Sequence, residues 1–237
     1  MYVVLSRLIF SRMFGMLFRT MDIKYLGHSS FQIKTKEARI VTDPFDPKMV
    51  GLKFPKTEAD IVTISHSHHD HNYIAGISGN PLVLDWPGEF ERMKMRIYGF
   101  RSFHDKKQGA ERGENVVYKI EAEGISILHC GDLGVVLTDD FLDDVGEVDI
   151  LMVPTGGFYT IDASEAVELV QKVEPKMVIP MHYNSPKLNQ EGFGKLSTVE
   201  EFLKKVGVEP QPAVAKLTLK KEDFGEEMKV VVMDISS

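Results

Sequence analysis

Cysteine is almost absent from this sequence, since Cys130 is the only one among 237 residues. A single cysteine excludes an internal disulfide framework and any Cys-x-x-Cys redox or zinc-ribbon site. Such cysteine usage is typical of a protein in a reducing compartment. We therefore expect a cytoplasmic location.

Basic residues are in deficit. Lys and Arg number 28 against 35 Asp and Glu, which gives a formal net charge of −7. Non-specific nucleic-acid binding needs a basic face, so we expect a small-molecule substrate and no nucleic-acid partner. The oligomeric state stays open, because the Phe-rich stretches at 10–18 and 90–103 could form a homo-oligomer interface or belong to the core.

Long uncharged apolar runs are also missing. Residues 1–20 are apolar and lack acids, but Arg7, Arg12 and Arg19 interrupt them, whereas a membrane span needs about 20 nearly uncharged residues. We expect no membrane span and, because no small-residue cleavage site follows, no signal peptide. The segment is either an amphipathic surface segment or, as we prefer, a misassigned extension before a natural start at Met21.

From residue 22 onward, short β-rich runs alternate with helical patterns. The chain is 43% hydrophobic and 27% charged, the balance of a globular protein, and we expect one domain over residues 21–237. A capping box of Asp162 and Glu165 predicts a helix over 163–173, and a second helix over 197–206 should end at Gly207. The predicted strands cover 22–26, 30–35, 38–42, 61–65, 82–84, 94–98, 116–121, 125–128, 150–153, 177–179, 215–220 and 228–235. Strands that later interleave with helices indicate an α/β sandwich.

Four of the eight histidines lie within six residues, in the string His66-Ser67-His68-His69-Asp70-His71 directly after the apolar strand at 61–65. Residues at i and i+2 of an extended segment project to the same side, so His66 and His68 can face one ion. Asp70 and His71 follow where the chain turns, and His69 should face away. A solvated or adventitious His-rich loop is the alternative. Imidazole and carboxylate suit Zn²⁺, and also Mn²⁺ or Fe²⁺.

One loop cannot complete such a site, and three more candidates follow strand-like or turn-like segments: His104, Asp132 and His182. Open α/β sheets place their sites where a strand ends and a loop begins. Each residue alone could equally be a structural hydrogen-bonding group. Their common placement favours all three as ligands.

The string His66-x-His68-x-Asp70-His71 matches the HxHxDH signature, and on it the sequence resembles the metallo-β-lactamase superfamily. Asp43 matches the first motif of that family, and His104, Asp132 and His182 match the third, fourth and fifth. The resemblance covers about residues 22–237 and is specific for the fold. Shorter strings are similar to a compact branch of largely uncharacterised hydrolases related to ascorbate-6-phosphate lactonase-like proteins: Gly27-His28-Ser29-Ser30, Pro87-Gly88-Glu89-Phe90, His129-Cys130-Gly131-Asp132 and Pro180-Met181-His182-Tyr183.

The resemblance implies a four-layer αββα sandwich of the α/β (α+β) class with two adjacent divalent metal ions, for which zinc is the first expectation. It implies that His66, His68 and His104 hold the first ion, that Asp70, His71 and His182 hold the second, and that Asp132 bridges them. Asp43 should orient a ligand through a hydrogen bond. Alternatively, Asp43 only starts a turn before Pro44.

The activity implied is metal-dependent hydrolysis, in which a metal-bound hydroxide cleaves an ester, lactone or phosphoester bond of a small substrate. Asp70 would orient the hydroxide as well as act as a ligand. His28 and His129 would either support the ligands from outside or face the substrate, and His28, His129 or Tyr183 would contact the substrate or protonate the leaving group. The fold does not identify the substrate.

Three other functions compete with this one. A nucleic-acid-processing nuclease would need a basic strip, and the sequence offers only the pair Lys106-Lys107. A non-catalytic metal-binding module should lack a ligand, and all seven are present. Redox chemistry at a di-iron site, with Cys130 as a soft ligand, usually requires an additional flavin domain. A buried Cys130 is the simpler expectation.

Overall fold

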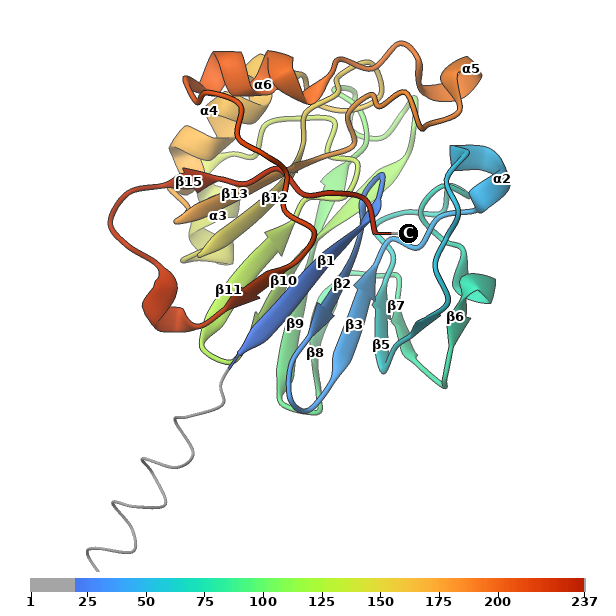
Figure 1. The fold of residues 1–237 in the computed structure, drawn as a ribbon, viewed down its shortest axis with the longest axis vertical. Coiled ribbons are helices and arrows are strands. Elements are labelled where there is room, and N and C mark those ends of the chain that lie inside the picture. Colours follow the sequence, from blue (N-terminus) through green and yellow to red (C-terminus); the bar gives the residue numbers. More distant parts are fainter. Residues whose placement is uncertain (1–19, 237) are drawn as a thin grey trace, which may run out of the picture.

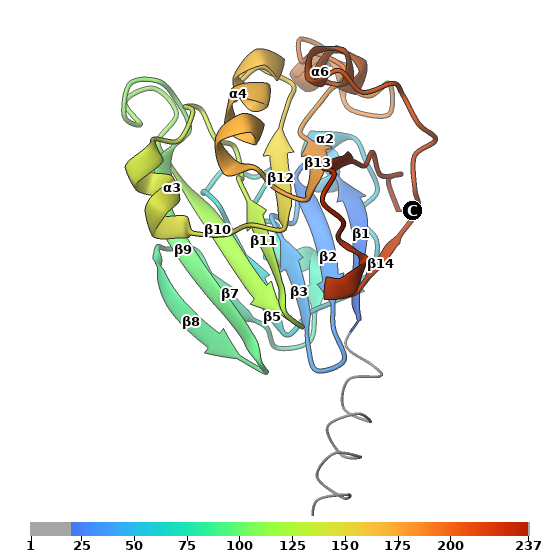
Figure 2. The same cartoon turned by 90° about the vertical axis from the view of Figure 1, so that its left-hand side faces the viewer.

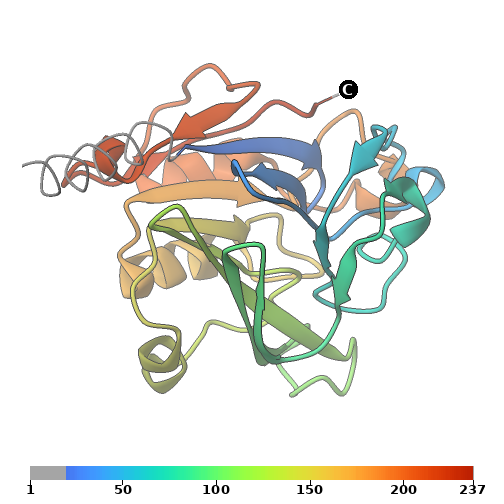
Figure 3. The same cartoon turned by 90° about the horizontal axis from the view of Figure 1, so that it is seen from below.

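Two β-sheets pack face to face in the computed structural model, which describes residues 20–236 (Figures 1 and 3). The first sheet has the strand order β14-β1-β2-β3-β5-β7, with bounds Leu217–Leu219, Met21–Gly27, Ser30–Lys34, Arg39–Thr42, Ile61–Thr63 and Leu82–Leu84. The second has the order β15-β13-β12-β11-β10-β9-β8, with bounds Lys229–Val230, Met177–Met181, Ile150–Pro154, Ile125–His129, Glu114–Ala122, Met95–Phe103 and Gly88–Arg92. A small parallel pair, β4 (Thr57–Glu58) and β6 (Ile77–Ser78), lies apart from both.

The main core lies between the two sheets. In β1 and β2 alternate side chains, among them Ile23, Phe31 and Ile33, are fully buried, as period-2 strands with one core-facing side require. Tyr118 of β10 is also fully buried, and its hydroxyl donates to the carbonyl of Leu84 at the end of β7 (2.9 Å), which connects the two sheets. This buried hydroxyl is therefore satisfied across the sandwich.

Helices cover the outer face of the second sheet. Figure 2 shows α3 (Asp139–Val145) and α4 (Ala163–Val173) in front of its strands, with α6 (Val199–Val206) beside them. The capping box of α4 is present, because Asp162 accepts from the amides of Ser164 and Glu165 and Glu165 accepts from the amide of Asp162. The predicted helix bounds of 163–173 are confirmed. The second predicted helix begins two residues late, at Val199, and ends at Gly207 as expected.

The outer face of the first sheet has a thinner cover. Its side chains, including Leu26, Val41 and Val62, pack in a second core cluster. Two four-residue helices, α2 (Pro47–Val50) and α5 (Gln190–Phe193), and their flanking loops lie over this cluster, and the 3₁₀ turn η1 (Ile74–Gly76) lies nearby. The predicted four-layer αββα sandwich is confirmed, with this outermost layer reduced to short helices.

Every strand predicted between residues 22 and 179 overlaps an observed one, but the predicted strand over 228–235 is wrong in extent. Only Lys229–Val230 pair with β13, and the chain then forms single bridges from Met233 to Val214 and from Ile235 to Tyr25. The apolar tail changes partner because it crosses from the edge of one sheet to the edge of the other. Short or acidic elements were not predicted: α2, α3, α5, β4, β6, β8 and the 3₁₀ turns η1 and η2 (Lys221–Asp223).

Within residues 20–236, no helix is both long and apolar enough to cross a membrane. The predicted surface segment or misassigned extension, and the Phe-rich stretch at 10–18, lie outside the described residues except for Thr20.

Removing the cap of α4 should weaken the fold measurably. We expect Asp162→Ala to lower the free energy of unfolding by about 1 kcal/mol, because two backbone N–H groups lose their acceptor. Urea denaturation followed by circular dichroism measures the change. Thr198→Ala is the matched control, since Thr198 caps α6 without a side-chain hydrogen bond. An equal loss in both variants would contradict the role given to the Asp162 carboxylate.

Candidate metal centre

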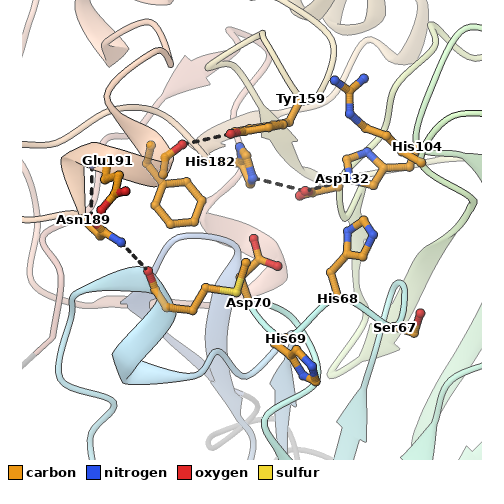
Figure 4. Close-up of a pocket in the computed structure, with 14 residues that line it drawn as sticks. Ser67, His68, His69, Asp70, His104, Asp132, Tyr159, His182, Asn189 and Glu191 are labelled. Carbon is orange, nitrogen blue, oxygen red and sulfur yellow. Dashed lines mark hydrogen bonds and ion pairs between the residues drawn. The ribbon is translucent and has the colours of Figure 1, made fainter.

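The sequence-predicted ligands converge at one end of the sandwich, where strands of both sheets give way to loops. His66 to His71 follow β5, and the other three, His104, Asp132 and His182, follow β9, β11 and β13. Figure 4 shows the side chains of His68, His104, Asp132 and His182 facing one another, while His69 points away. His69 belongs to none of the groups of ligand atoms described below, in agreement with its exclusion from the ligand set.

Three groups of side chains have ligand atoms within 4.8 Å of one another, and they overlap. The first is His66, His68 and His104, and the second is Asp70, His71 and His182 together with His28. The third is His66, His71 and Asp132, which links the other two. Geometry therefore brings together all seven predicted ligands, in groups that contain the two sets implied by the resemblance, with Asp132 in the group that links them.

Asp132 is the central carboxylate of this cluster. Its Oδ2 lies 3.1 Å from His182 Nε2 and 3.4 Å from His104 Nε2, and its Oδ1 lies 3.3 Å from His71 Nε2. Burial alone would raise the pKa of Asp132, but His182 and His71 hold it well below its ordinary value. Burial likewise opposes a charge on His71, and the carboxylates of Asp132 and Asp70 outweigh it and raise the pKa of His71 well above its ordinary value.

Asp43 anchors two of the histidines from below. Its Oδ2 accepts from His71 Nδ1 (2.9 Å) and from the hydroxyl of Ser65 (2.6 Å), while Oδ1 accepts from the Ser65 amide (2.7 Å). The Ser65 hydroxyl in turn lies 2.9 Å from His66 Nδ1. These bonds leave Nε2 of His71 and of His66 to face the cluster. The predicted hydrogen bond to a ligand is thus observed, and the tautomer it fixes stays a prediction.

His28 belongs to the cluster from the turn between β1 and β2. Its Nε2 lies 3.2 Å from Asp70 Oδ2, and its carbonyl accepts from the backbone amide of His182 (2.8 Å). Burial lowers the pKa of His28 to about 4, so the ring is neutral near pH 7. His28 does not line the cavity described below, so the structure places it against a predicted ligand and beneath the site.

The predicted substrate contact of His129 is not supported by its placement. His129 is fully buried, and its Nε2 donates to the carbonyl of Ser29 (2.8 Å) while its Nδ1 accepts from the amide of Gly131 (3.3 Å). Both ring nitrogens are satisfied by backbone, and the residue lines no part of the cavity. Tyr183 is likewise absent from the cavity wall, and Cys130 is buried outside the three ligand groups.

Asn115 of β10 is a site residue that the sequence did not reveal. It is fully buried, its Oδ1 accepts from the amide of Asp132 (2.9 Å), and its amide donates to Ser102 and to the carbonyl of Cys130. Gly131 (φ 56°) allows this close approach, because a Cβ there would lie 2.5 Å from Asn115 Oδ1. The sequence does carry a signal for this residue, because an asparagine directly precedes the predicted apolar strand 116–121. A buried amide there needs hydrogen-bond partners.

The residues present fit a divalent metal pair. The buried Nε2 atoms of His66, His71 and His182, and Asp132 Oδ1, have no hydrogen-bond partner of good geometry, although His71 and His182 lie close to Asp132 as given above. Native proteins rarely leave such atoms unpaired, because each costs about 1–3 kcal/mol. Metal ions give these atoms partners, and a set of imidazoles and carboxylates suits Zn²⁺, Mn²⁺ or Fe²⁺.

A cavity of about 650 Å³ opens directly above the cluster. Besides five predicted ligands and His69, its wall contains residues from loops and short helices that the sequence did not single out: Met49, Ser67, Arg112, Tyr159, Asn189, Glu191, Gly192 and Phe193. The Tyr159 hydroxyl donates to the Gly192 carbonyl (2.9 Å), and the Asn189 amide donates to the Met49 carbonyl (3.2 Å), as Figure 4 shows. These bonds hold α2, α5 and the loop at 159 together as one wall.

The loop after His104 is held by one carboxylate. Asp105 accepts from the backbone amides of Lys107, Gly109, Glu111 and Arg112, at 2.7 to 3.0 Å. Burial would raise the pKa of Asp105, and these four donors instead lower it to about 2. The chain therefore returns to the cavity at a fixed position.

Asp105→Asn should loosen this loop without unfolding the protein. We expect faster hydrogen exchange of the amides of Gly109, Glu111 and Arg112, because a neutral side chain with one acceptor oxygen cannot serve four donors. Hydrogen-exchange mass spectrometry measures this. Asp139→Asn is the control, because that exposed carboxylate forms its ion pair with Lys172 and accepts no hydrogen bond from the loop over 105–113. Unchanged exchange over 105–113 would contradict the anchoring role.

Comparison with known proteins places this site in a family. The model of the beta-lactamase superfamily domain matches residues 22–182. A UPF0173 metal-dependent hydrolase from Pelotomaculum thermopropionicum is 31% identical over 76% of this chain and 92% of its own. One from Thermococcus onnurineus is 28% identical over 82% of this chain and 96% of its own.

Two solved structures have the same fold. Igni18, described as a metallo hydrolase from Ignicoccus hospitalis, is 20% identical, covers 85% of this chain and 99% of its own, and superposes with a TM-score of 0.65. A Thermotoga maritima protein, provisionally described as a Zn-dependent hydrolase of the metallo-β-lactamase superfamily, is 38% identical with a TM-score of 0.74, over 90% of this chain and 98% of its own. The resemblance predicted from the HxHxDH string is thus confirmed, and the chain belongs to the metallo-β-lactamase superfamily.

Proposed function

We propose that this chain is a metal-dependent hydrolase that uses two divalent ions to cleave an ester, lactone or phosphoester bond of a small substrate. Zinc is the ion that we expect first. The observation that carries the proposal is the cluster of buried, unpartnered ring nitrogens, together with Asp132 Oδ1, at the floor of an open cavity. The relatives described as metal-dependent hydrolases support it. A cytoplasmic location and homo-oligomer formation stay predictions from the sequence.

The proposed ligand sets follow the observed groups. His66, His68 and His104 would hold one ion, Asp70, His71 and His182 the other, and Asp132 would touch both. Two divalent cations bound there would lower the pKa of a bound water molecule and would polarise a carbonyl or phosphoryl oxygen of the substrate. Asp43 holds the Nδ1 of His71, so that its Nε2 faces the carboxylates.

Asp70 has a second proposed part, in orienting the attacking water. Its carboxylate is almost fully buried, and His71 and His28 keep the pKa of Asp70 well below its ordinary value. The ionised carboxylate can therefore accept a hydrogen bond at neutral pH. His28 positions this carboxylate through the 3.2 Å contact. Neither His28, His129 nor Tyr183 lines the cavity, so we assign protonation of the leaving group to water.

Metal content is the first test. For protein purified without a histidine tag, we expect elemental mass spectrometry to find about two equivalents of zinc, manganese or iron per chain. His68→Ala should lose one equivalent, because the first ion keeps only His66 and His104. His69→Ala is the matched control, as the neighbouring histidine belongs to no ligand group and should keep both ions.

The outcomes separate the alternatives. One equivalent in the wild type would leave hydrolysis with a single ion, and none, with no uptake on adding metal, would overturn the proposal. Hydrolysis of aryl esters, lactones and phosphodiesters should disappear with a chelator and return with metal. A protein with two ions that cleaves none of these classes would favour a binding module, and salt-sensitive retention on DNA or RNA would favour a nuclease.

Asp43→Asn should weaken metal binding while the fold persists. We expect a loss of about 10- to 100-fold in affinity, because outer hydrogen-bond partners fix the ring of a ligating histidine. Competition with a chromophoric chelator measures it. Asp149→Asn is the control, since Asp149 is a buried carboxylate that serves Ser126 and Lys221 far from the cluster. An equal loss in both variants would reveal general destabilisation instead.

A further inference from the structure

Arg112 is the only lysine or arginine among the residues that line the cavity. It enters the cavity from the loop after His104 and lies next to the aromatic wall, with its guanidinium carbon 5.7 Å from the centre of the Tyr159 ring. At this distance a cation is attracted to the ring face. Contact with the face of the ring leaves the N–H groups at the edge of the guanidinium available.

The guanidinium of Arg112 has no carboxylate partner among residues 20–236. Of the other arginines in these residues, Arg39, Arg96 and Arg101 each pair with a glutamate, whereas Arg92 forms no ion pair and does not line the cavity. Glu111, the neighbour of Arg112 in the sequence, pairs with Lys107. Glu191 lines the same cavity as Arg112 but forms no ion pair with it. An unpaired, half-buried guanidinium in a cavity is suited to an external anion.

The backbone of Arg112 is fixed with respect to the cluster. Its amide donates to Asp105 Oδ2 (2.7 Å), and the carbonyl of the next residue, Gly113, accepts from the amide of His104 (3.0 Å). The side chain therefore starts from a position set directly by a predicted metal ligand. A substrate group bound by Arg112 would keep a defined distance from the cluster, which is the positioning that catalysis needs.

The rest of the upper wall is largely apolar. Met49, Tyr159 and Phe193 come from three different segments and line the cavity together. Met49 is 42% exposed, so its side chain offers apolar surface to whatever enters. A small substrate that fills this cavity needs apolar surface for these side chains and an anionic group for Arg112.

We propose that Arg112 binds a carboxylate or phosphate group at the end of the substrate remote from the cleaved bond, while the apolar part of the substrate lies on Met49, Tyr159 and Phe193. This inference rests on the proposed function and gives its substrate class: a small anionic ester, lactone or phosphoester with an apolar body. The fork of N–H donors in arginine pairs with either oxyanion in a bidentate manner.

Three probes with a shared phenylpropyl group test the proposal on metal-loaded protein: 4-phenylbutanamide (neutral), 4-phenylbutanoate (carboxylate) and 3-phenylpropylphosphonate (phosphonate). Calorimetric titration measures their affinities. We expect an anionic probe to bind the wild type about tenfold more tightly than the amide, and Arg112→Met to remove that preference while the affinity for the amide is unchanged. The anion whose affinity depends more on Arg112 identifies the headgroup.

Matched variants separate charge from shape. Arg112→Lys keeps the charge without the fork and should retain part of the preference, and Glu191→Gln should tighten anion binding by removing a like charge from the cavity. Arg96→Met removes an arginine on the far side of the second sheet, paired with Glu121, and should behave as the wild type. Because the metal ions are present in every variant, direct binding of the probe to metal cancels in the comparison.

Three results would overturn the proposal: no binding of either anion to the wild type, the same anion affinity in Arg112→Met, or an equal loss for the amide. Hydrolysis is scored separately. A protein that prefers anions through Arg112 but cleaves no ester, lactone or phosphoester would keep this inference as a binding property and remove the proposed function. A protein that cleaves neutral esters without anion preference would keep the proposed function and remove the inference about Arg112.

Discussion

The carboxylate of Asp43 forms the hydrogen bonds on which the geometry of the cluster depends. It lies at the end of β3, fully buried, and accepts from His71 and twice from Ser65. Ser65 in turn contacts His66, so one carboxylate fixes a residue of each proposed ligand set. Burial opposes its charge, and the hydrogen bond from His71 is the main interaction that nevertheless keeps the pKa of Asp43 low. An ionised Asp43 is needed because a protonated one could accept fewer of these bonds.

Backbone strain also occurs at the cluster, which holds three of the nine non-glycine residues with positive φ in the part of the chain that the structure describes. His28, Asp43 and His182 have positive φ angles of 58°, 39° and 51°. Such conformations cost about 1–3 kcal/mol each for residues other than glycine, and surrounding structure must offset them. Here the His182 amide donates to the His28 carbonyl, and the Asp43 amide donates to the Thr63 carbonyl. The backbones of His28 and His182, two of these strained residues, are thus bonded to each other, and both side chains belong to one ligand group.

Much of the fold and nearly all of the cluster could be predicted, because both follow from local pattern. His66 and His68 lie two residues apart after a buried strand, and the structure puts both in one ligand group. The prediction for His129 was less well founded. Ile125, Ile127 and His129 alternate along β11 and share the inward face, so strand period alone places His129 in the core beside Phe31. Arg112 and Tyr159 could not be found, since loop closure brings them to the cavity from distant parts of the chain.

The residues at the strand ends and the residues of the loops differ in their proposed parts: the first would carry the chemistry and the second the substrate selectivity. The proposed ligands occupy strand ends, whose positions are set by two sheets and a shared core, so they tolerate little change. The upper wall comes from α2, α5 and two loops, and hydrogen bonds such as that of Tyr159 with Gly192 hold it together. Loops on a rigid scaffold accept substitution more easily than strand ends do. Arg112 belongs to the variable part, but its amide is bonded to Asp105, the residue after His104, so its backbone position is linked to that of a proposed ligand.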